Sequence, residues 1–489
     1  MAKYDIIIIG SGLGGLQCAY ILAKQGLNVC VSEKNTQAGG CLQTFRRGKH
    51  TFDTGFHYVG GLDEGQPLRR FFDYFRLTDL PLHRLDKNGF DEVIFDNRHF
   101  MFVNGYECFV DKMTEYFPHE RAGLKKYADF LNRISDNIFL SLTKKNDTKT
   151  TELLSISTFD YLQSLTDNQL LMNILSGTSL KADLNPKTLP LYIFAQINSS
   201  YIQSAWRLKG GGPQITNTLI QNIKNQGGTV LTESAVTRLV EKGSKLIAAE
   251  INGSEQIEAE RFISDIHPSN LMDLIADSPN IRKSYRNRIK NLKNSFGMFT
   301  AHLALKENST PYLNRNLYIY ENGDVWQNEK NRQSKRALIT FKVPDDNSLY
   351  TKNIDIMTPL AWESVEPWEN TVSGKRGDDY KDFKKRMANE CIALASRYIP
   401  DLKDKITNVY ASTPLTYRDY TGTPFGSAYG INKDCNNLIS TLLSPKTSIP
   451  NLFLTGQNLN FHGILGVSVT SFLTCAEIIG QEKAIEGLI

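Results

Sequence analysis

The stretch of sequence that decides the fold is DIIIIGSGLGGLQCAYILAKQGLNVCVSEK, residues 5–34. It opens with a run of β-branched residues, 6–9, whose length is typical of a strand buried on both faces of a parallel sheet. The run leads into a GxGxxG turn at 10–15, after which apolar residues recur at helical spacing as far as Gly26. A second predicted strand, 27–32, ends at Glu33. This order of strand, glycine turn, helix, strand and acid predicts a Rossmann-like α/β unit that binds a dinucleotide.

Each part of this pattern has a physical reason. Gly10 permits the tight turn, Gly12 lets a diphosphate approach the backbone, and Gly15 lets the helix pack closely against the strand. The start of the helix offers free N–H groups and a positive dipole end to the phosphates. Glu33, which follows Gly15 by 18 residues, can accept two hydrogen bonds from an adenosine ribose. A structural turn followed by an unrelated glutamate is the alternative interpretation.

A second pair of glycines, Gly39 and Gly40, follows Glu33 closely. It leads into the sequence FDTGFHYVGG at 52–61. Two adjacent glycines let another stretch of backbone approach a cofactor just beyond the ribose-binding acid. A domain that binds NAD has no use for such a feature at this point, so the pair favours FAD.

These motifs together, GxGxxG…E…GG…T…FDxGxHYxG, resemble the FAD-dependent phytoene desaturase, carotenoid isomerase and retinol saturase family of amine-oxidase-like flavoproteins. The stretch 52–61 is particularly similar to the retinol saturase branch. The resemblance continues through the glycine turn 210–213, the strand region 227–239 and the closing segment 452–467. It covers about a third of the chain by direct motif, at both ends and in the centre.

The resemblance implies a fold in which a Rossmann-like FAD-binding domain carries a discontinuous, mixed α+β substrate domain. It implies that FAD is held by Gly10, Gly12, Leu13, Gly14, Gly15, Glu33, Lys34, Gly39, Gly40, Val236, Gly456, Gln457, Gly463, Gly466 and Val467. Gln457 departs from the pattern, because many members of the wider superfamily carry an acid there that binds the ribityl chain. A glutamine amide can still bond a ribityl hydroxyl. A helix starting near 463–467 would direct its positive end at the flavin.

Candidate catalytic groups are His57 and Tyr58, after the FDTG turn, and His462, before the closing helix. Each could donate or accept a proton beside the flavin. A core histidine bonded to a backbone carbonyl is the alternative for each imidazole. Arg207 and Lys209 flank the second glycine turn, and we expect both to be surface charges or to lie near a phosphate. No metal site is expected, because the seven cysteines are scattered and include no CxxC pair.

The domain division follows from these motifs. We expect the FAD domain to comprise residues 1–72, 205–285 and 430–489, with a small antiparallel meander over 228–264. The substrate domain comprises 73–204 and 286–429, and carries a helical lid. Aromatic residues at helical spacing predict helices from about 73 to 204, and strands are expected at 295–305, 317–320, 337–343 and 354–357. Three polar segments, 143–152, 327–337 and 371–385, are predicted to be exposed loops or parts of the lid.

Composition narrows the remaining choices. The 489 residues carry 56 Lys and Arg against 52 Asp and Glu, a net charge of +4 that argues against nucleic acid as a partner. Asp5 interrupts the first apolar run, and no run approaches the length of a membrane span. We therefore expect a cytoplasmic location, with peripheral contact between the 120–205 insert and the inner face of a membrane as a further hypothesis.

The resemblance implies an FAD-dependent oxidoreductase that acts on carbon–carbon double bonds of a hydrophobic polyene, retinoid, carotenoid or other unsaturated lipid. The saturase-like stretch favours reduction, with NADPH, NADH or another electron donor. Desaturation and isomerisation of carotenoid-type substrates stay open. Two alternatives come from other classes: a non-catalytic isoprenoid-binding escort protein, and an amine oxidase.

Overall fold

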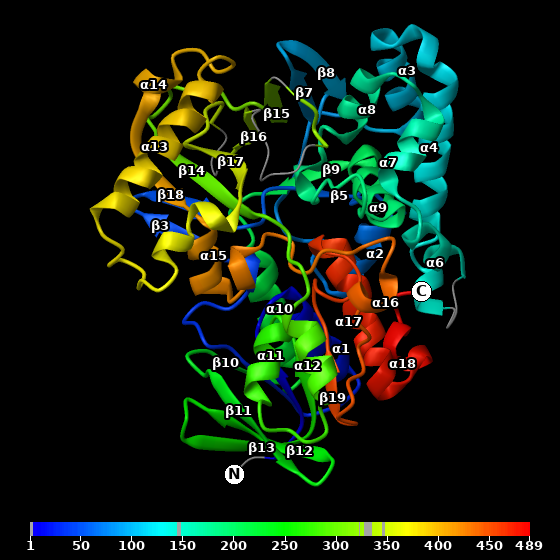
Figure 1. Ribbon diagram of the computed structural model, residues 1–489, viewed down its shortest axis with the longest axis vertical. Helices are drawn as coiled ribbons and strands as arrows, with labels where there is room; N and C mark the ends of the chain where they lie inside the picture. Colours follow the sequence, from blue (N-terminus) through cyan, green and yellow to red (C-terminus); the bar gives the residue numbers. More distant parts are fainter. Residues whose placement is uncertain (1–2, 144–147, 322, 327–334, 345–347) are drawn as a thin grey trace.

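The computed structural model describes residues 3–143, 148–321, 323–326, 335–344 and 348–489. Two seven-stranded sheets organise these residues. The first lies at the bottom of Figure 1 and the second at the top, with a group of helices beside the second sheet.

The first sheet is built around the opening strand. Its strand order is β10-β2-β1-β13-β12-β11, with β19 also paired to β13. Five strands run parallel, and β11 and β12 are antiparallel additions. The bounds are β1 Lys3–Ile9, β2 Val29–Ser32, β10 Thr229–Leu231, β11 Val236–Lys242, β12 Lys245–Ile251, β13 Glu255–Ser264 and β19 Leu452–Leu454. The meander expected over 228–264 is therefore present as β11 to β13, whereas β10 joins the parallel part.

The isoleucine run of β1 faces apolar cores on both sides of this sheet. Ile6 and Ile8 belong to the core that contains α1 (Leu13–Lys24) and α10 (Pro213–Asn225). Ile7 and Ile9 belong to the core under α11 (Pro268–Leu274) and α12 (Lys283–Lys290). The C-terminal helix α17 (Gly463–Ile479) packs against α1, followed by α18 (Gln481–Ile485). The two ends of the chain therefore build one domain, with α1 and α17 side by side (Figure 1).

The second sheet has the order β18-β14-β17-β16-β15-β7-β8. Only the β15–β7 pair is parallel. Its strands are β7 Asp91–Phe95, β8 Arg98–Phe102, β14 Gly297–Leu305, β15 Asn316–Glu321, β16 Lys335–Phe341, β17 Asn353–Leu360 and β18 Ile406–Ser412. Helix α13 (Asp378–Ala395) shares an apolar core with these strands. The four strands expected between 295 and 357 are those labelled β14 to β17.

The prediction of helices throughout 73–204 is wrong for β7 and β8, which form a hairpin inside that segment. The turn between them, Asp96 and Asn97, has φ values of 48° and 64°. Asp and Asn tolerate this left-handed conformation, which matches the twist of a two-residue hairpin. The residues on which the helix prediction rests, at 71–75 and 127–139, do lie largely in the helices Pro67–Tyr74 and Arg121–Asp136, whereas residues 91–102 pair as strands. The hairpin also brings the two predicted substrate-domain segments into one sheet, although the domain division itself stays a prediction.

Helices make up most of the rest of residues 67–204 and lie on the right of Figure 1. They are α2 Pro67–Tyr74, α3 Tyr106–Tyr116, α4 Arg121–Asp136, α5 Leu140–Thr143, α6 Thr148–Leu154, α7 Thr158–Leu165, α8 Gln169–Ser176 and α9 Leu191–Gln203. There are also two small sheets. β3 Thr44–Arg47 pairs with β4 His50–Asp53 and contacts the second sheet, and β9 Ala205–Leu208 pairs with β5 Val59–Gly60 and β6 Leu82–Arg84 beside helix α9. Short helices α14 Leu402–Lys405, α15 Pro414–Thr421 and α16 Leu438–Thr441 complete the fold.

The polar segments only partly match their prediction as loops. Helix α6 begins at Thr148 and helix α13 at Asp378, so the ends of two of these segments are helical. Residues 144–147 and 327–334 lie outside the described residues. Within the part of the chain that the structure describes, no helix is both long enough and apolar enough to cross a bilayer.

Candidate functional site

One cavity of about 550 Å³ runs from the glycine turn after β1 to the second sheet. Residues from the turn, from Glu33 and from the second glycine pair line one part of it. Helix α9 and the strands β14, β16 and β17 contribute Tyr201, Met298, Leu338 and Met357 to another part. A cavity of this size lies within the range of small-molecule and cofactor sites.

Most of the predicted cofactor residues meet at this cavity. The following line it: Gly10, Gly12, Leu13, Gly14, Glu33, Lys34, Gly39, Gly40, Val236, Gln457, Gly463 and Val467, together with the candidate catalytic residues His57, Tyr58 and His462. Gly15, Gly456 and Gly466 are absent from the lining and lie just behind it, where a side chain would strike a neighbour: Gly10, Asp265 and Phe461 respectively. The roles assigned to all these residues stay predictions.

The glycine turn has the geometry that a dinucleotide cradle requires. Gly10 has a φ of +94°, a conformation that L side chains rarely adopt. A Cβ atom on Gly15 would lie 2.3 Å from the Gly10 carbonyl oxygen, so helix α1 meets the strand too closely for any side chain. A Cβ atom on Gly40 would lie 3.3 Å from Cα of Gly12, so the two glycine segments are in contact. These residues leave two stretches of bare backbone at the cavity, which fits a diphosphate.

Glu33 and Ser11 connect the parts of this cradle. Oε2 of Glu33 accepts hydrogen bonds from the Ser11 backbone N–H at 3.1 Å and from the Ser11 hydroxyl at 2.6 Å. Its Oε1 accepts one from the Asn35 N–H at 2.8 Å. The Ser11 hydroxyl in turn accepts a hydrogen bond from the Gly39 N–H at 3.2 Å. Oε2 thus accepts two hydrogen bonds already, whereas Oε1 keeps a lone pair for a ribose hydroxyl. Ser11 is therefore part of the cradle, although the GxGxxG pattern leaves its position unspecified.

Asp265, just after β13, is a second residue that sequence analysis missed. Its carboxyl group accepts hydrogen bonds from the backbone N–H groups of Gly12 and Gly15, and it lines the cavity. Burial raises the pKa of Asp265 to about 7, and the nearby Glu33 charge acts in the same direction. An ionised Asp265 would stand at the helix end where a diphosphate binds. The sequence signal for this residue is its position directly after a parallel strand of the nucleotide-binding sheet.

We expect Asp265→Asn to bind dinucleotide roughly tenfold more tightly than wild type at pH 8, with little difference at pH 5.5. The folded chain keeps its Asp265 proton between about pH 4 and pH 7, where the unfolded chain loses it. The free energy of unfolding of the wild-type chain therefore falls as the pH rises through this interval, and Asp265→Asn lacks this decrease. Titration calorimetry and thermal unfolding at the two pH values measure both effects. The exposed Asp273→Asn is the control, and equal binding by Asp265→Asn and wild type at pH 8 would contradict the expectation.

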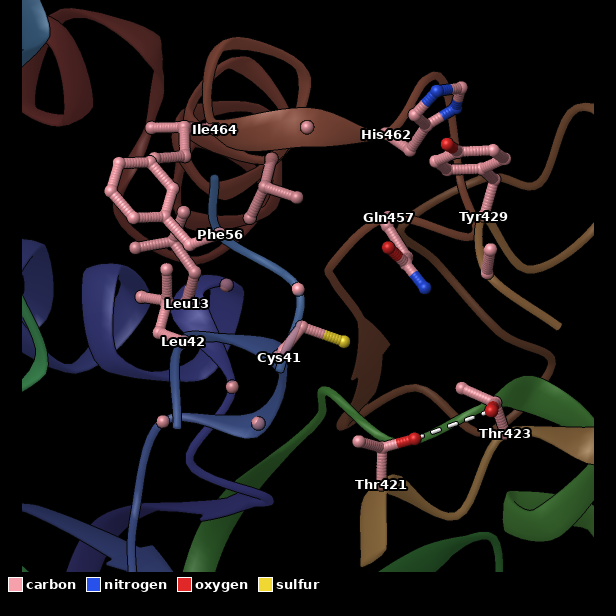
Figure 2. A pocket seen from close by; sticks show the side chains of 18 of the residues that line it. Leu13, Cys41, Leu42, Phe56, Thr421, Thr423, Tyr429, Gln457, His462 and Ile464 are labelled. Atoms are coloured by element: carbon pink, nitrogen blue, oxygen red, sulfur yellow. Dashed lines mark hydrogen bonds between the residues drawn. The ribbon is translucent and has the colours of Figure 1, made fainter. Parts of the chain in front are cut away.

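The closing segment presents polar groups to the same cavity. Figure 2 shows Gln457, His462 and Tyr429 on one side, with the apolar Leu13, Leu42, Phe56 and Ile464 on the other. The His462 ring stacks on Tyr429 with their centres 4.5 Å apart. Its Nε2 donates to the Lys181 carbonyl at 2.6 Å, and burial lowers the pKa of His462 to about 4. His462 is therefore neutral at physiological pH, and its Nε2 proton is already used to hold the backbone of Lys181.

His57 faces a cluster of buried polar groups. Its Nδ1 lies 4.0 Å from Asp355, which also pairs with His302 at 2.7 Å. Burial lowers the pKa of His57 to about 4, an effect that Asp355 partly offsets. Asp53, from the same FDTG motif, has a pKa raised to about 6 by burial, and one of its carboxyl oxygens has no hydrogen-bond partner among the described residues. At neutral pH, His57 therefore carries a proton on only one ring nitrogen, and its other ring nitrogen can accept one.

Tyr58 belongs to a separate cluster that reaches into the protein. Its hydroxyl donates to Asp91 at 2.7 Å and lies 2.6 Å from the hydroxyl of Tyr318. Lys181 donates to the same Tyr58 oxygen at 2.7 Å. Asp91, Lys181 and Tyr318 come from three distant parts of the chain, and no motif in the sequence indicates that they meet.

Arg207 is not a surface charge, so that part of the expectation is wrong for it. Its side chain is only 3% exposed. It donates to the Tyr312 hydroxyl at 2.9 Å, to the Arg315 carbonyl at 3.1 Å and to the Asn316 amide oxygen at 2.6 Å. Strand β9 directs Arg207 inward because successive residues of a strand face opposite sides.

Over nearly its whole length the chain is similar to retinol reductases and prolycopene isomerases. The NAD(P)-binding Rossmann-like domain family matches residues 8–75. The human all-trans-retinol 13,14-reductase is 26% identical over 98% of this chain and 85% of its own length. An inactive all-trans-retinol 13,14-reductase of Danio rerio is also 26% identical over 98% of the chain. A chloroplastic prolycopene isomerase of an Oncidium hybrid cultivar is 23% identical over 99% of the chain and 85% of its own length.

Solved structures confirm the predicted fold class. Putrescine oxidase superposes with a TM-score of 0.64 at 15% identity, covering 98% of this chain and 99% of that one. The Rab GDI of Plasmodium falciparum superposes with a TM-score of 0.55 at 13% identity, covering 98% of each chain. At these identities the likeness establishes the amine-oxidase-type architecture alone.

Proposed function

We propose that this chain, a distant relative of the retinol saturase and prolycopene isomerase flavoproteins, is an FAD-dependent oxidoreductase that reduces a carbon–carbon double bond in a hydrophobic polyene. The observation that carries the proposal is a continuous cavity. It joins the dinucleotide cradle to an apolar chamber, the part lined by Phe56, Met298, Leu338, Met357 and Phe461. A cofactor in the cradle and a lipid in the chamber would share that space. The full-length relation to a retinol reductase supports reduction as the direction.

The residues present fit FAD. The bare backbone of the two glycine segments would take the diphosphate, Glu33 the ribose hydroxyls, and the strand start at Val236 the adenine. Gln457 and the start of helix α17 would face the ribityl chain and the flavin edge. When bound, FAD supplies hydride transfer. The chain's own part is to orient the cofactor, exclude water and hold a proton beside the substrate.

The chamber suits an apolar polyene better than a cationic amine. Its lining includes Phe56, Met298, Leu338, Met357 and Phe461. The charged group at this part of the cavity is Lys181, which would repel an ammonium ion and leaves an uncharged chain unaffected. This observation favours a polyene over the amine substrates of the structural relatives.

Membrane contact through the 120–205 insert is not part of the proposal. Among the described residues of that insert, no large hydrophobic side chain is exposed. The exposed ones lie elsewhere, for example Leu349, Val372 and Ile439.

The direct test is anaerobic. Protein with its flavin chemically reduced is mixed with retinoids, carotenoid precursors and other unsaturated lipids, and flavin reoxidation is followed by absorbance. We expect at least one polyene to reoxidise the flavin and to gain two hydrogens, as measured by mass spectrometry. A product of unchanged mass with a moved or rotated double bond would instead indicate an isomerase. A purified protein without flavin would favour the escort-protein alternative.

A further inference from the structure

Lys181 is an unusual lining residue of the chamber. Of the lysines and arginines in the described part of the chain, only Lys34 and Lys181 line the cavity. Lys34 follows Glu33, whereas Lys181 lies with Tyr58, Tyr201 and Tyr429. The Lys181 side chain is 13% exposed, and its Nζ lies 3.8 Å from the centre of the Tyr201 ring. A buried ammonium group in apolar surroundings is costly unless other groups stabilise it.

The stabilising groups form a continuous network behind Lys181. Its Nζ donates to the Tyr58 hydroxyl at 2.7 Å and lies 3.7 Å from the Asp91 carboxylate. Asp91 is fully buried, and accepts hydrogen bonds from Tyr58 at 2.7 Å and from the Asn316 amide at 2.7 Å. Tyr318 lies 2.6 Å from the Tyr58 hydroxyl. Of the three N–H donors of Lys181, one bonds Tyr58 and a second is directed at Asp91, which leaves one for the chamber.

The backbone at Lys181 is fixed from the cofactor side. His462 donates to the Lys181 carbonyl at 2.6 Å, and the Tyr429 hydroxyl donates to the Leu180 carbonyl at 2.5 Å. Both donors line the cavity near the start of helix α17. The position of Lys181 is therefore tied to the segment that would face the flavin.

We propose that Lys181 is the acid that protonates the substrate carbon, and that Tyr58, Asp91 and Tyr318 are positioning residues that hold it in place. This inference rests on the proposed function, since it assigns a donor to that reaction. Burial lowers the pKa of Lys181 to about 8, an effect that Asp91 partly offsets. A donor whose pKa lies near the working pH gives up its proton readily.

When bound, reduced FAD would supply the two electrons as a hydride for one carbon of the double bond. The π electron pair forms a new C–H bond at the neighbouring carbon with the proton of the Lys181 ammonium, whose N–H bond breaks. Lys181 is left as a neutral amine, which regains a proton from solvent after the product leaves the cavity. The C=C bond is reduced and the flavin is oxidised.

The test compares Lys181→Met and Lys181→Arg in the flavin-loaded protein. Arginine keeps the positive charge but holds its proton too tightly to transfer it. We expect both variants to slow flavin reoxidation by polyene at least about 100-fold, with flavin content and polyene binding within about twofold of wild type. Lys187→Met, an exposed lysine of the same segment, is the matched control and retains the wild-type rate.

Chemical rescue separates proton donation from a structural role. Added ethylamine should raise the rate of flavin reoxidation in Lys181→Ala at least tenfold. The separate variant Tyr58→Phe should show a rate about tenfold below wild type. Wild-type turnover by Lys181→Arg, or turnover by Lys181→Met within twofold of wild type, would overturn the proposal and leave the proposed function standing. A wild-type protein that reduces no polyene would overturn both.

Discussion

A Gly15→Ala variant is expected to bind FAD at least about 100-fold more weakly than the wild-type chain, a loss of about 2.7 kcal/mol. The added Cβ would lie 2.3 Å from the Gly10 carbonyl oxygen, which is backbone and cannot rotate away. Either the turn opens or helix α1 moves off the strand. Both changes displace the Gly12 and Gly15 N–H groups, whose hydrogen bonds hold Asp265. Fluorescence titration of the stripped protein with FAD measures the loss.

The matched control is Gly89→Ala. A Cβ atom there would meet Met101 Sδ at 3.4 Å, an ordinary van der Waals contact. We expect this variant to bind FAD within about twofold of wild type. Wild-type affinity in Gly15→Ala would mean that the cofactor does not depend on the close approach of helix and strand.

The second large effect is on stability. We expect Arg207→Met to lower the free energy of unfolding by about 2–4 kcal/mol. The methionine fills much of the same volume but donates no hydrogen bond. The Arg315 carbonyl and the Asn316 amide oxygen would each lose the donor that Arg207 supplies. Because Asn316 donates to Asp91, the loss also loosens the network behind Lys181.

Chemical unfolding followed by fluorescence measures this change. Lys209→Met, two residues along the chain, is the control, because Lys209 is more exposed than Arg207 and its side chain forms no hydrogen bond with the described residues; we expect a change below about 0.5 kcal/mol. Equal stability of the Arg207 and Lys209 variants would show that the buried contacts of Arg207 contribute little.

Local patterns in the sequence were enough to predict the dinucleotide-binding unit. The isoleucine run, the glycine turn and Glu33 are close together in the sequence. The structure of each can be predicted from the residues next to it in the chain. The closing helix was predicted to start near 463–467 for the same reason, and it begins at Gly463. The cavity that these elements share follows from the parallel sheet, since strand ends meet at one edge.

The hairpin at 91–102 and the chamber could not be predicted in the same way. Helical and strand periodicity are hard to separate in short aromatic runs, and only the pairing of β7 with β15 decides the matter. Lys181, Asp91 and Tyr318 are brought together by contacts between residues far apart in the chain. Asp265 stands next to Gly12 for the same reason. Tyr58 alone in this cluster was marked by a motif.

The identity of the bound coenzyme decides whether this chain is an FAD protein. Protein purified under native conditions is denatured by heat, and the released supernatant is analysed by chromatography and mass spectrometry. We predict FAD in a ratio near one per chain, and uptake of FAD but not of NAD by the stripped protein. Absence of any flavin in the supernatant, together with failure of the stripped protein to bind FAD, would contradict the account.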